Sequence, residues 1–432
     1  MENKILDIAK NAKLSALKMT QISSTLKNEV LLKIAENIEL SKQQIFDANA
    51  LDLKLSQESG ISSALLGRLK LDENKLRDMV QGVKDVAKLE DPINKILDET
   101  ELDEGLILKK ISCPIGVLGI IFEARPDVIS QISALAIKSS NVVILKGGKE
   151  ATNTNKTIAQ IINDTLNTFS DFPKNVINLV FSREDIQEML KLDNYIDLII
   201  PRGSNQLVKH IKENTKIPVL GHADGICHIF VDKDADINKA LEICIDSKIQ
   251  YPSACNAVET ILVHKEIAEN FLNDFNKLCQ KNDVTLKGCK KTCEILNDIQ
   301  KANEEDWQTE YSAKIVSVKI INSLEDAIEH INFYGSHHTD CIITENIQNA
   351  EIFMNNVDSA GVYHNVSTRF ADGFRYGFGA EIGISTNKTH ARGPVGLEGL
   401  TIYKYKLYGN GQTVKDYANG TKKFTHKKIL HD

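Results

Sequence analysis

The sequence Gly116-Val-Leu-Gly-Ile-Ile-Phe122 precedes an amphipathic segment, Val128 to Lys138, and then Asn141-Val-Val-Ile-Leu-Lys146. The first and last of these runs are short, apolar and rich in β-branched residues, which is typical of buried strands. The segment between them has the apolar spacing of an amphipathic helix. This succession predicts a βαβ unit in a mostly parallel sheet, and such sheets bind ligands at the carboxyl ends of their strands.

The same alternation continues along most of the chain. A second series of strands begins near Gly225, and no tandem repeat or low-complexity linker separates it from the first. We therefore expect two α/β lobes packed together. The other predicted strands are Leu106 to Ile111, Val176 to Phe181, Ile196 to Ile200, Ile226 to Val231, Val258 to Val263, Ile315 to Ile321 and Cys341 to Thr344. The other predicted helices are Thr154 to Leu166 and Asn205 to Glu213.

The residues before Pro92 predict a helical layer. Their apolar side chains recur at three- and four-residue steps, so that they fall on one face of each helix. The residues of these two faces are Val30, Leu31, Ile34, Ala35 and Ile38, and then Leu76, Met79, Val80, Val83 and Val86.

The composition is that of an ordinary soluble globular protein. A chain of 432 residues is too long for one compact core, which favours two or three domains. A net charge of −7 gives no electrostatic reason to expect a nucleic acid or an anionic membrane as a partner. The eight cysteines are scattered, and we see no signal peptide or long apolar stretch, so we expect free thiols in the cytoplasm. Cys289 and Cys293 lack a second ligand pair, so no metal site is predicted.

The most reactive candidate is Cys255, in Tyr251-Pro-Ser-Ala-Cys-Asn-Ala257. Proline and small neighbours allow a substrate to approach the thiol and leave backbone N–H groups to stabilise an oxyanion. The alternative is a buried structural cysteine, because free cysteine is among the most buried residue types. The local sequence leaves both possibilities open.

Two strand-to-helix junctions carry glycine and positive charge. The first contains Lys146, Gly147, Gly148 and Lys149, and the second contains Arg202, Gly203 and Ser204. Such junctions bring backbone N–H groups close to a phosphate, so the pair favours a dinucleotide. The alternatives are a tight turn that needs glycine and an Arg202 that pairs with a surface acid.

Two further clusters are candidates for binding an anionic substrate. Arg125 is followed by Pro126, which fixes the backbone beside a guanidinium that can bind phosphate or a carbonyl oxygen. Its alternative role is a surface ion pair. Ser367, Thr368 and Arg369 lie in a segment rich in Gly, Ser, Thr and Asn, which predicts a polar loop suited to a carboxylate.

Taken together and in order, these motifs resemble the γ-glutamyl phosphate reductases, a family of the aldehyde dehydrogenase superfamily. The likeness runs from the first helices to about Gly411. The motifs are Pro114 to Gly119, Glu123 to Asp127, Ile144 to Gly148, Pro201 to Ser204, Gly221 to His228, Tyr251 to Ala257, Asn365 to Phe370 and Gly379 to Thr386. Ser253 and Val366 stand where the family pattern implies a smaller residue, and the tail from Lys415 to Asp432 matches no motif.

The resemblance implies a reaction. The family reduces L-glutamyl 5-phosphate with NADPH to L-glutamate 5-semialdehyde in proline biosynthesis, and it releases phosphate. By this likeness Cys255 attacks the acyl phosphate and a thioester forms. We expect the Cys255 N–H, with the side chain of Asn256 or Arg125 as further candidates, to stabilise the oxyanion.

The resemblance also bears on hydrolysis and on the cofactor. Oxidising members of the superfamily have a glutamate base that activates water, whereas this chain reads Gly221-His-Ala-Asp-Gly225, which favours reduction. His222 remains an open candidate for that base. Members that prefer NAD often have a carboxylate three residues after the strand-end lysine, where this chain has Lys149, so we expect NADPH. Glu310 resembles the residue that binds the nicotinamide ribose.

By the same analogy, the expected fold is aldehyde dehydrogenase-like, with two Rossmann-like lobes and a β-hairpin flap. The expected ranges are 1–97 and 113–225 for nucleotide binding, 226–388 for catalysis, and 98–112 with 389–432 for the flap and tail. Glu101 to Ser112 and Leu400 to Tyr408 form the flap, which implies a homodimer or a higher even oligomer. The chain is too short to include a glutamate 5-kinase, so we expect a separate kinase to supply the substrate.

Three rival functions remain. One is an NAD(P)-dependent dehydrogenase that acts on another acyl donor or aldehyde. Another is a cysteine acyl hydrolase in which His222 or His228 activates Cys255. The third is a protein with a purely structural role.

Overall fold

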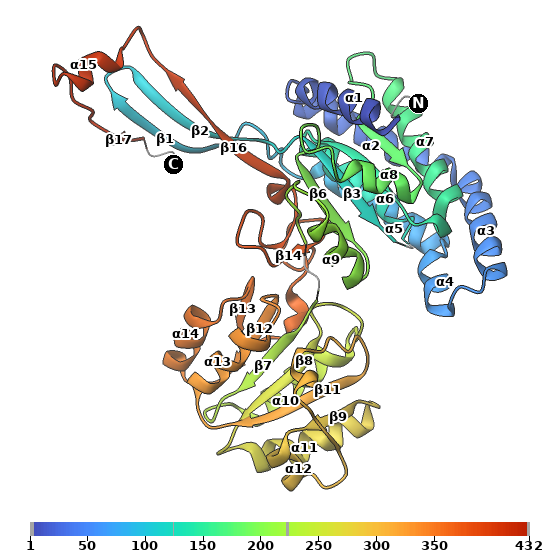
Figure 1. The fold of residues 1–432 in the computed structure, drawn as a ribbon, viewed down its shortest axis with the longest axis vertical. Helices are drawn as coiled ribbons and strands as arrows, with labels where there is room; N and C mark the ends of the chain where they lie inside the picture. The colour runs from blue at the N-terminus through green and yellow to red at the C-terminus, as the bar shows by residue number, and fades with distance from the viewer. Residues whose placement is uncertain (1–3, 124, 222–223, 430–432) are drawn as a thin grey trace. The chain divides into compact units, whose positions relative to one another are not determined.

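The computed structural model describes residues 4–123, 125–221 and 224–429, with the side chains at 63 and 64 left out. The chain divides into two compact units (Figure 1). The first unit comprises Met1–Gly203, His210–Leu220 and Gly396–Asp432, and the second comprises Ser204–Lys209 and Gly221–Val395.

The first unit contains a parallel sheet of four strands in the order β5-β4-β3-β6. The strands are β3 (Val117–Phe122), β4 (Val142–Lys146), β5 (Ile177–Val180) and β6 (Leu198–Arg202). After β5 the chain returns to the other side of β3, so the strand order reverses there. This reversal is where open parallel sheets bind ligands.

Helices surround this sheet. They are α1 (Lys4–Met19), α2 (Ser24–Leu40), α3 (Lys42–Glu58), α4 (Ser63–Leu69), α5 (Glu73–Lys88), α6 (Val128–Lys138), α7 (Thr152–Asn167) and α8 (Arg183–Met189), with α9 (Asn205–Glu213) divided between the units. The two apolar faces predicted on α2 and α5 are buried and the two helices contact each other. The predicted ranges of α6 and α9 agree with the structure residue for residue.

A separate antiparallel sheet also belongs to the first unit. Its order is β16-β2-β1-β17, and Figure 1 shows β1, β2 and β16 side by side. The strands are β1 (Ile96–Asp103), β2 (Leu106–Pro114), β16 (Thr401–Tyr408) and β17 (Lys427–Lys428), with the short helix α15 (Val414–Ala418) between the last two. The strand predicted at Leu106 to Ile111 therefore lies in this sheet and not in the βαβ series, because its neighbours β1 and β16 both pair with it antiparallel.

The second unit has a parallel sheet of seven strands in the order β10-β9-β11-β8-β7-β12-β13. The strands are β7 (Cys227–Val231), β8 (Val258–His264), β9 (Thr285–Gly288), β10 (Gln300–Lys301), β11 (Ile315–Ile321), β12 (Thr339–Ile343) and β13 (Gly361–His364). The helices are α10 (Ile237–Ile249), α11 (Ala268–Lys281), α12 (Lys290–Ile295), α13 (Leu324–Tyr334) and α14 (Ile347–Asn356). A two-stranded sheet, β14 (Ile384–Ser385) and β15 (Gly393–Pro394), is separate.

Alternation along the strands builds a core on each face of this sheet. On β7, Ile229 and Val231 pack with Phe271 and Phe275 of α11, whereas Phe230 between them packs with Phe353 of α14. Successive side chains of a strand point to opposite faces, so one apolar run fills both cores. Within the described ranges, no helix combines the length and the apolar character that crossing a bilayer requires.

Candidate active site

Cys255 lies in the turn that connects α10 to β8. Two backbone hydrogen bonds close this turn, from Ala254 N to Tyr251 O at 3.1 Å and from Ala257 N to Ala254 O at 2.9 Å. Cys255 itself is partly exposed. We call residues 251–257 the cysteine turn.

The backbone before β7 packs directly against the cysteine turn. A Cβ added at Gly225 would lie 2.1 Å from Cys255 O and 2.6 Å from Cys255 Cα. The Cys227 thiol donates a hydrogen bond to the same carbonyl at 3.3 Å. Any side chain at 225 would displace Cys255, so glycine is required there by the close approach of two backbones.

Four other cysteines have the properties of core residues. Burial raises the pKa of Cys227 and Cys244, and it raises the pKa of Cys279 and Cys341 to about 12. A thiol with such a pKa is inert at neutral pH because the thiolate is the nucleophile. None of the eight cysteines, all of them described, forms a disulfide bond.

The segment after β13 lies against the cysteine turn and determines its position. Thr368, fully buried, donates from Oγ1 to Asn256 O at 2.7 Å. The Thr368 N–H donates to Ser247 Oγ at 3.2 Å, and Ser247 also bonds Ser367 Oγ at 3.0 Å. Both hydroxyl groups that the sequence predicts for a substrate carboxylate are therefore engaged with the protein.

Asn256 and Arg369 are also held by neighbouring groups. Asn256 Nδ2 donates to Ala371 O at 2.8 Å, which leaves one amide hydrogen. Arg369 is 8 % exposed, and its Nε donates to Gln250 Oε1 at 2.8 Å. Burial, followed by the charge of Arg375, lowers the pKa of the Arg369 guanidinium. Arg369 thus places a desolvated cation beside the cysteine turn.

These residues gather at the amino ends of the second unit's strands. Gly225 precedes β7, Cys255 precedes β8 and Glu310 precedes β11. The rule that ligands bind at the carboxyl ends of parallel strands does not describe these three residues, because the loops that carry them enter the strands, whereas Ser367, Thr368 and Arg369 follow β13.

A buried ion pair beneath the cysteine turn is not among the predicted site residues. Lys248 Nζ lies 2.7 Å from Glu259 Oε2, and the two side chains are 0 % and 1 % exposed. Burial lowers the pKa of Lys248 and raises the pKa of Glu259 to about 7. The sequence signal is a charged residue in each of the two segments that flank the cysteine turn, the second of them inside the apolar run Ala257 to Val263.

Glu310 lies in a short segment that leads into β11. Asn205 Nδ2 donates to Glu310 Oε2 at 3.5 Å. The next residue, Tyr311, donates from its hydroxyl to Asp306 Oδ1 at 2.8 Å and bonds Ser317 Oγ at 2.7 Å. Ser312 follows with a left-handed backbone, φ 50°, and its N–H donates to Glu259 Oε1 at 3.4 Å.

The residues predicted for a dinucleotide lie at the carboxyl edge of the first unit's sheet. Lys146 ends β4 and Arg202 ends β6, and Glu123 N, directly after β3, donates to Arg202 O at 3.2 Å. Burial lowers the pKa of Lys146. Arg125 follows β3, and its Nη2 lies 3.2 Å from Asp127 Oδ2.

The turn after β4 packs closely on α7. A Cβ at Gly147 would lie 2.1 Å from Asn155 Nδ2 and 3.1 Å from Phe122 Cε2. Asn155 is 2 % exposed, and its Oδ1 has no hydrogen-bond partner among the described residues. The cations and the turn without side chains fit a phosphorylated nucleotide.

Two histidines, His222 and His228, are predicted as alternative bases. His222 lies outside the described residues. Asp224 accepts a hydrogen bond from Asn205 Nδ2. His228 is fully buried, and its Nδ1 lies 3.0 Å from Asp340 Oδ1. Asp340 therefore already orients this imidazole inside the core.

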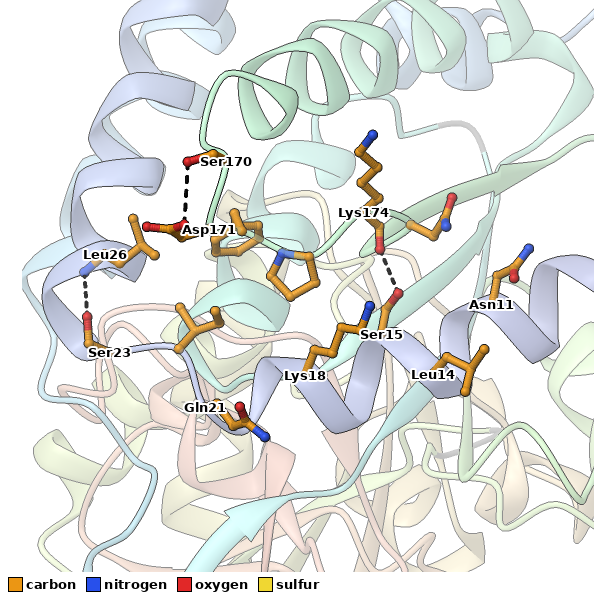
Figure 2. A pocket seen from close by; sticks show the side chains of 14 residues that line it. Asn11, Leu14, Ser15, Lys18, Gln21, Ser23, Leu26, Ser170, Asp171 and Lys174 are labelled. Carbon is orange, nitrogen blue, oxygen red and sulfur yellow. Dashed lines mark hydrogen bonds between the residues drawn. The ribbon is translucent and has the colours of Figure 1, made fainter.

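Two cavities lie elsewhere in the described structure. One of about 920 Å³ is lined by α1, the turn to α2, and the segment from Ser170 to Asn175, and Figure 2 shows the lining side chains, among them Lys18 and Gln21. Ser15 Oγ donates to Lys174 O at 2.6 Å across it. The other, of about 780 Å³, is lined by residues of β11 and α13. None of the predicted site residues lines either cavity.

Comparison with known proteins gives consistent results. Residues 2–292 match the aldehyde dehydrogenase family. A γ-glutamyl phosphate reductase of Brachyspira hyodysenteriae is 61 % identical over 429 residues, which cover 98 % of this chain and 99 % of that protein. The crystal structure of a γ-glutamyl phosphate reductase from Thermotoga maritima matches with a TM-score of 0.93 and 39 % identity, covering 95 % of this chain and all of that one. A glyceraldehyde-3-phosphate dehydrogenase of Methanocaldococcus jannaschii, solved with NADP, shares the fold at 17 % identity, a TM-score of 0.66 and 94 % coverage of each chain.

Proposed function

The chain belongs to the γ-glutamyl phosphate reductases of the aldehyde dehydrogenase family, and on this premise we propose that Cys255 is its nucleophile. The reaction is the reduction of L-glutamyl 5-phosphate to L-glutamate 5-semialdehyde with release of phosphate, a step of proline biosynthesis. The observation that carries the assignment is the cysteine turn, where a partly exposed thiol is fixed by Gly225, Asn256 and Thr368.

The chemistry follows from a thiolate at that position. Cys255 Sγ attacks the carbonyl carbon of the acyl phosphate, the bond from carbon to the phosphate oxygen breaks, and phosphate leaves with the electron pair. The product on the protein is a thioester. A bound, reduced nicotinamide supplies a hydride. Once the carbonyl carbon is reduced, the hemithioacetal oxygen reforms a carbonyl, the carbon–sulfur bond breaks, and the thiolate is regenerated.

The attack of Cys255 turns the substrate's carbonyl oxygen into an oxyanion, which needs hydrogen-bond donors directed at it. We assign the Cys255 N–H to this role, with the remaining amide hydrogen of Asn256 and the guanidinium of Arg125 as further donors. For the anionic ends of the substrate we assign Arg369 and Arg125, because a guanidinium binds carboxylate and phosphate with paired donors. Ser367 and Thr368 then act by positioning the cysteine turn.

We assign cofactor binding to Lys146, Gly147, Gly148 and Lys149 after β4 and to Arg202, Gly203 and Ser204 after β6. NADPH is the proposed cofactor. Lys149 carries a positive charge where a 2′-phosphate would add a negative one, and attraction between them favours the phosphorylated form. Glu310 is assigned to the nicotinamide ribose.

We also propose that the chain forms a homodimer or a higher even oligomer and that a separate kinase supplies its substrate. The antiparallel sheet of β1, β2, β16 and β17 exposes apolar residues of β16, which suits a contact with a second copy. The acyl phosphate is labile, so a separate glutamate 5-kinase supplies it in the same cytoplasm.

The test is a coupled assay with glutamate, ATP, a glutamate 5-kinase and NADPH, in which the loss of nicotinamide absorbance is recorded. We expect turnover by the wild type and by Cys279→Ala, whose thiol is buried in the core, and none by Cys255→Ala, which still binds NADPH. Substantial turnover by Cys255→Ala would contradict the proposed role of Cys255 as the nucleophile. Equal turnover with acetyl phosphate would instead favour a dehydrogenase for another acyl donor.

A further inference from the structure

Glu259 is a buried carboxylate that contacts two segments of the proposed site. One oxygen, Oε2, lies 2.7 Å from Lys248 Nζ. The other, Oε1, accepts a hydrogen bond from Ser312 N at 3.4 Å. The side chain is 1 % exposed, so water does not compete for either oxygen.

Lys248 and Glu259 flank the cysteine turn at its base. Lys248 is in the last turn of α10, and Glu259 is the second residue of β8. Residues 250–257 between them carry Cys255. The ion pair therefore closes the loop that presents the thiol.

Ser312 is two residues from Glu310. Its left-handed backbone is uncommon for a residue other than glycine, so the chain there needs support from its neighbours. Tyr311 is fixed by Asp306 and Ser317, and the Ser312 N–H is fixed by Glu259. The Glu310 carboxylate acts on both groups of the pair: it opposes the lowering of the Lys248 pKa by burial and adds to the raising of the Glu259 pKa by burial, which agrees with its closeness to the pair.

Stability alone does not account for a buried pair of this kind. Two well-packed apolar residues of similar volume are often as stable as a buried ion pair, because the pair loses its hydration. An apolar residue at 259, however, would leave the Ser312 N–H without its acceptor. The feature that only a polar residue provides is the link to the Glu310 segment.

We propose that Glu259 is a positioning residue, which holds Glu310 for the cofactor through the Ser312 amide and joins that segment to the base of the cysteine turn through Lys248. This inference rests on the proposed roles of Glu310 and Cys255. It predicts that loss of the Ser312 acceptor weakens the use of NADPH even when the protein remains folded.

The test compares two double variants that differ in one group. Lys248→Met with Glu259→Leu removes the charge and the acceptor, whereas Lys248→Met with Glu259→Gln keeps an amide oxygen for Ser312. We expect the KM for NADPH to rise roughly 3- to 10-fold in the first, the equivalent of one hydrogen bond, and to stay within about 2-fold of the wild type in the second. Equal KM values in the two would overturn the inference.

A second comparison separates this inference from the proposed role of Glu310. Both double variants are made again with Glu310→Gln. If Glu259 acts through Glu310, the difference between the Leu and Gln versions disappears in that background. A difference of the same factor in both backgrounds contradicts the inference, while an unchanged KM in Glu310→Gln alone contradicts the ribose assignment on which it rests.

Two controls cover effects on folding. Asp91→Asn removes a carboxylate 2.5 Å from another buried lysine, Lys27, in the first unit, and it should lower the melting temperature without changing the KM for NADPH. If the Leu variant does not unfold cooperatively, Glu259→Met with Lys248→Met replaces it, since methionine fills irregular space more easily. In either comparison the second protein is Lys248→Met with Glu259→Gln.

Discussion

Thr368→Val removes one hydroxyl group and keeps the shape of the side chain. In the native protein this hydroxyl donates to Asn256 O at 2.7 Å, and the residue is fully buried. The variant leaves a buried carbonyl without its donor, which costs about 1–3 kcal/mol in the free energy of unfolding. For a unit of this size that corresponds to a loss of about 2–4 °C in melting temperature per kcal/mol.

The same change tests what Thr368 does for catalysis. If it positions the cysteine turn, the thiol moves relative to the substrate, and a displacement approaching 1 Å lowers kcat by up to about 100-fold. The KM for glutamyl phosphate should change little, because no substrate contact is lost. Steady-state kinetics with a kinase-generated substrate, alongside melting curves, measure both quantities.

Thr368→Ser serves as the matched control because it retains the donor. We expect its kcat and its melting temperature to lie near those of the wild type. A Val variant with normal kcat and a KM raised several-fold would refute this reasoning, since that pattern belongs to a residue that binds the substrate directly.

Further predictions concern acid stability, cofactor choice and assembly. Burial, with the nearby charges of His228 and Lys319, lowers the pKa of His330 to about 2. Below pH 6.5 the unfolded state therefore binds more protons than the native state, and the free energy of unfolding decreases as the pH decreases. Between pH 6 and 4 this group should lower the free energy of unfolding of the wild type by about 1.4 kcal/mol per pH unit, and His330→Asn should lack this contribution. Urea titrations measure both proteins, and parallel plots of the free energy of unfolding against pH would refute the prediction. Lys149→Glu should raise the KM for NADPH at least about 10-fold while that for NADH falls or stays constant, and an unchanged ratio of kcat/KM values would contradict the cofactor assignment. Tyr405→Lys on exposed β16 should lower the mass measured by light scattering at micromolar concentration, and an unaltered mass would exclude this strand from the interface.

The fold could be predicted from the sequence wherever it depends on local periodicity. The apolar runs locate β3, β4 and β8 and the amphipathic pattern gives α6, because a buried strand and a half-buried helix each impose a period on the chain. The place of β2 could not be predicted from its own residues. Its sheet is decided by pairing with β16, which lies almost three hundred residues later.

The candidate site could be predicted in part. Motifs locate the cysteine turn and the two junctions rich in glycine and positive charge, since these depend on turn chemistry. The burial of Thr368 and of the Lys248–Glu259 pair could not be predicted, because polar residues in a loop and charges near a helix end are usually solvated. Only the tertiary structure gives them partners that permit burial.

The most direct measurement of the central claim is mass spectrometry of the protein after rapid acid quenching, with glutamyl phosphate generated in place and no reduced cofactor present. We expect one glutamyl group on the peptide that contains Cys255, its loss when NADPH is added before the quench, and no adduct in Cys255→Ala. An adduct that persists in Cys255→Ala, or that maps to another cysteine, would contradict the account.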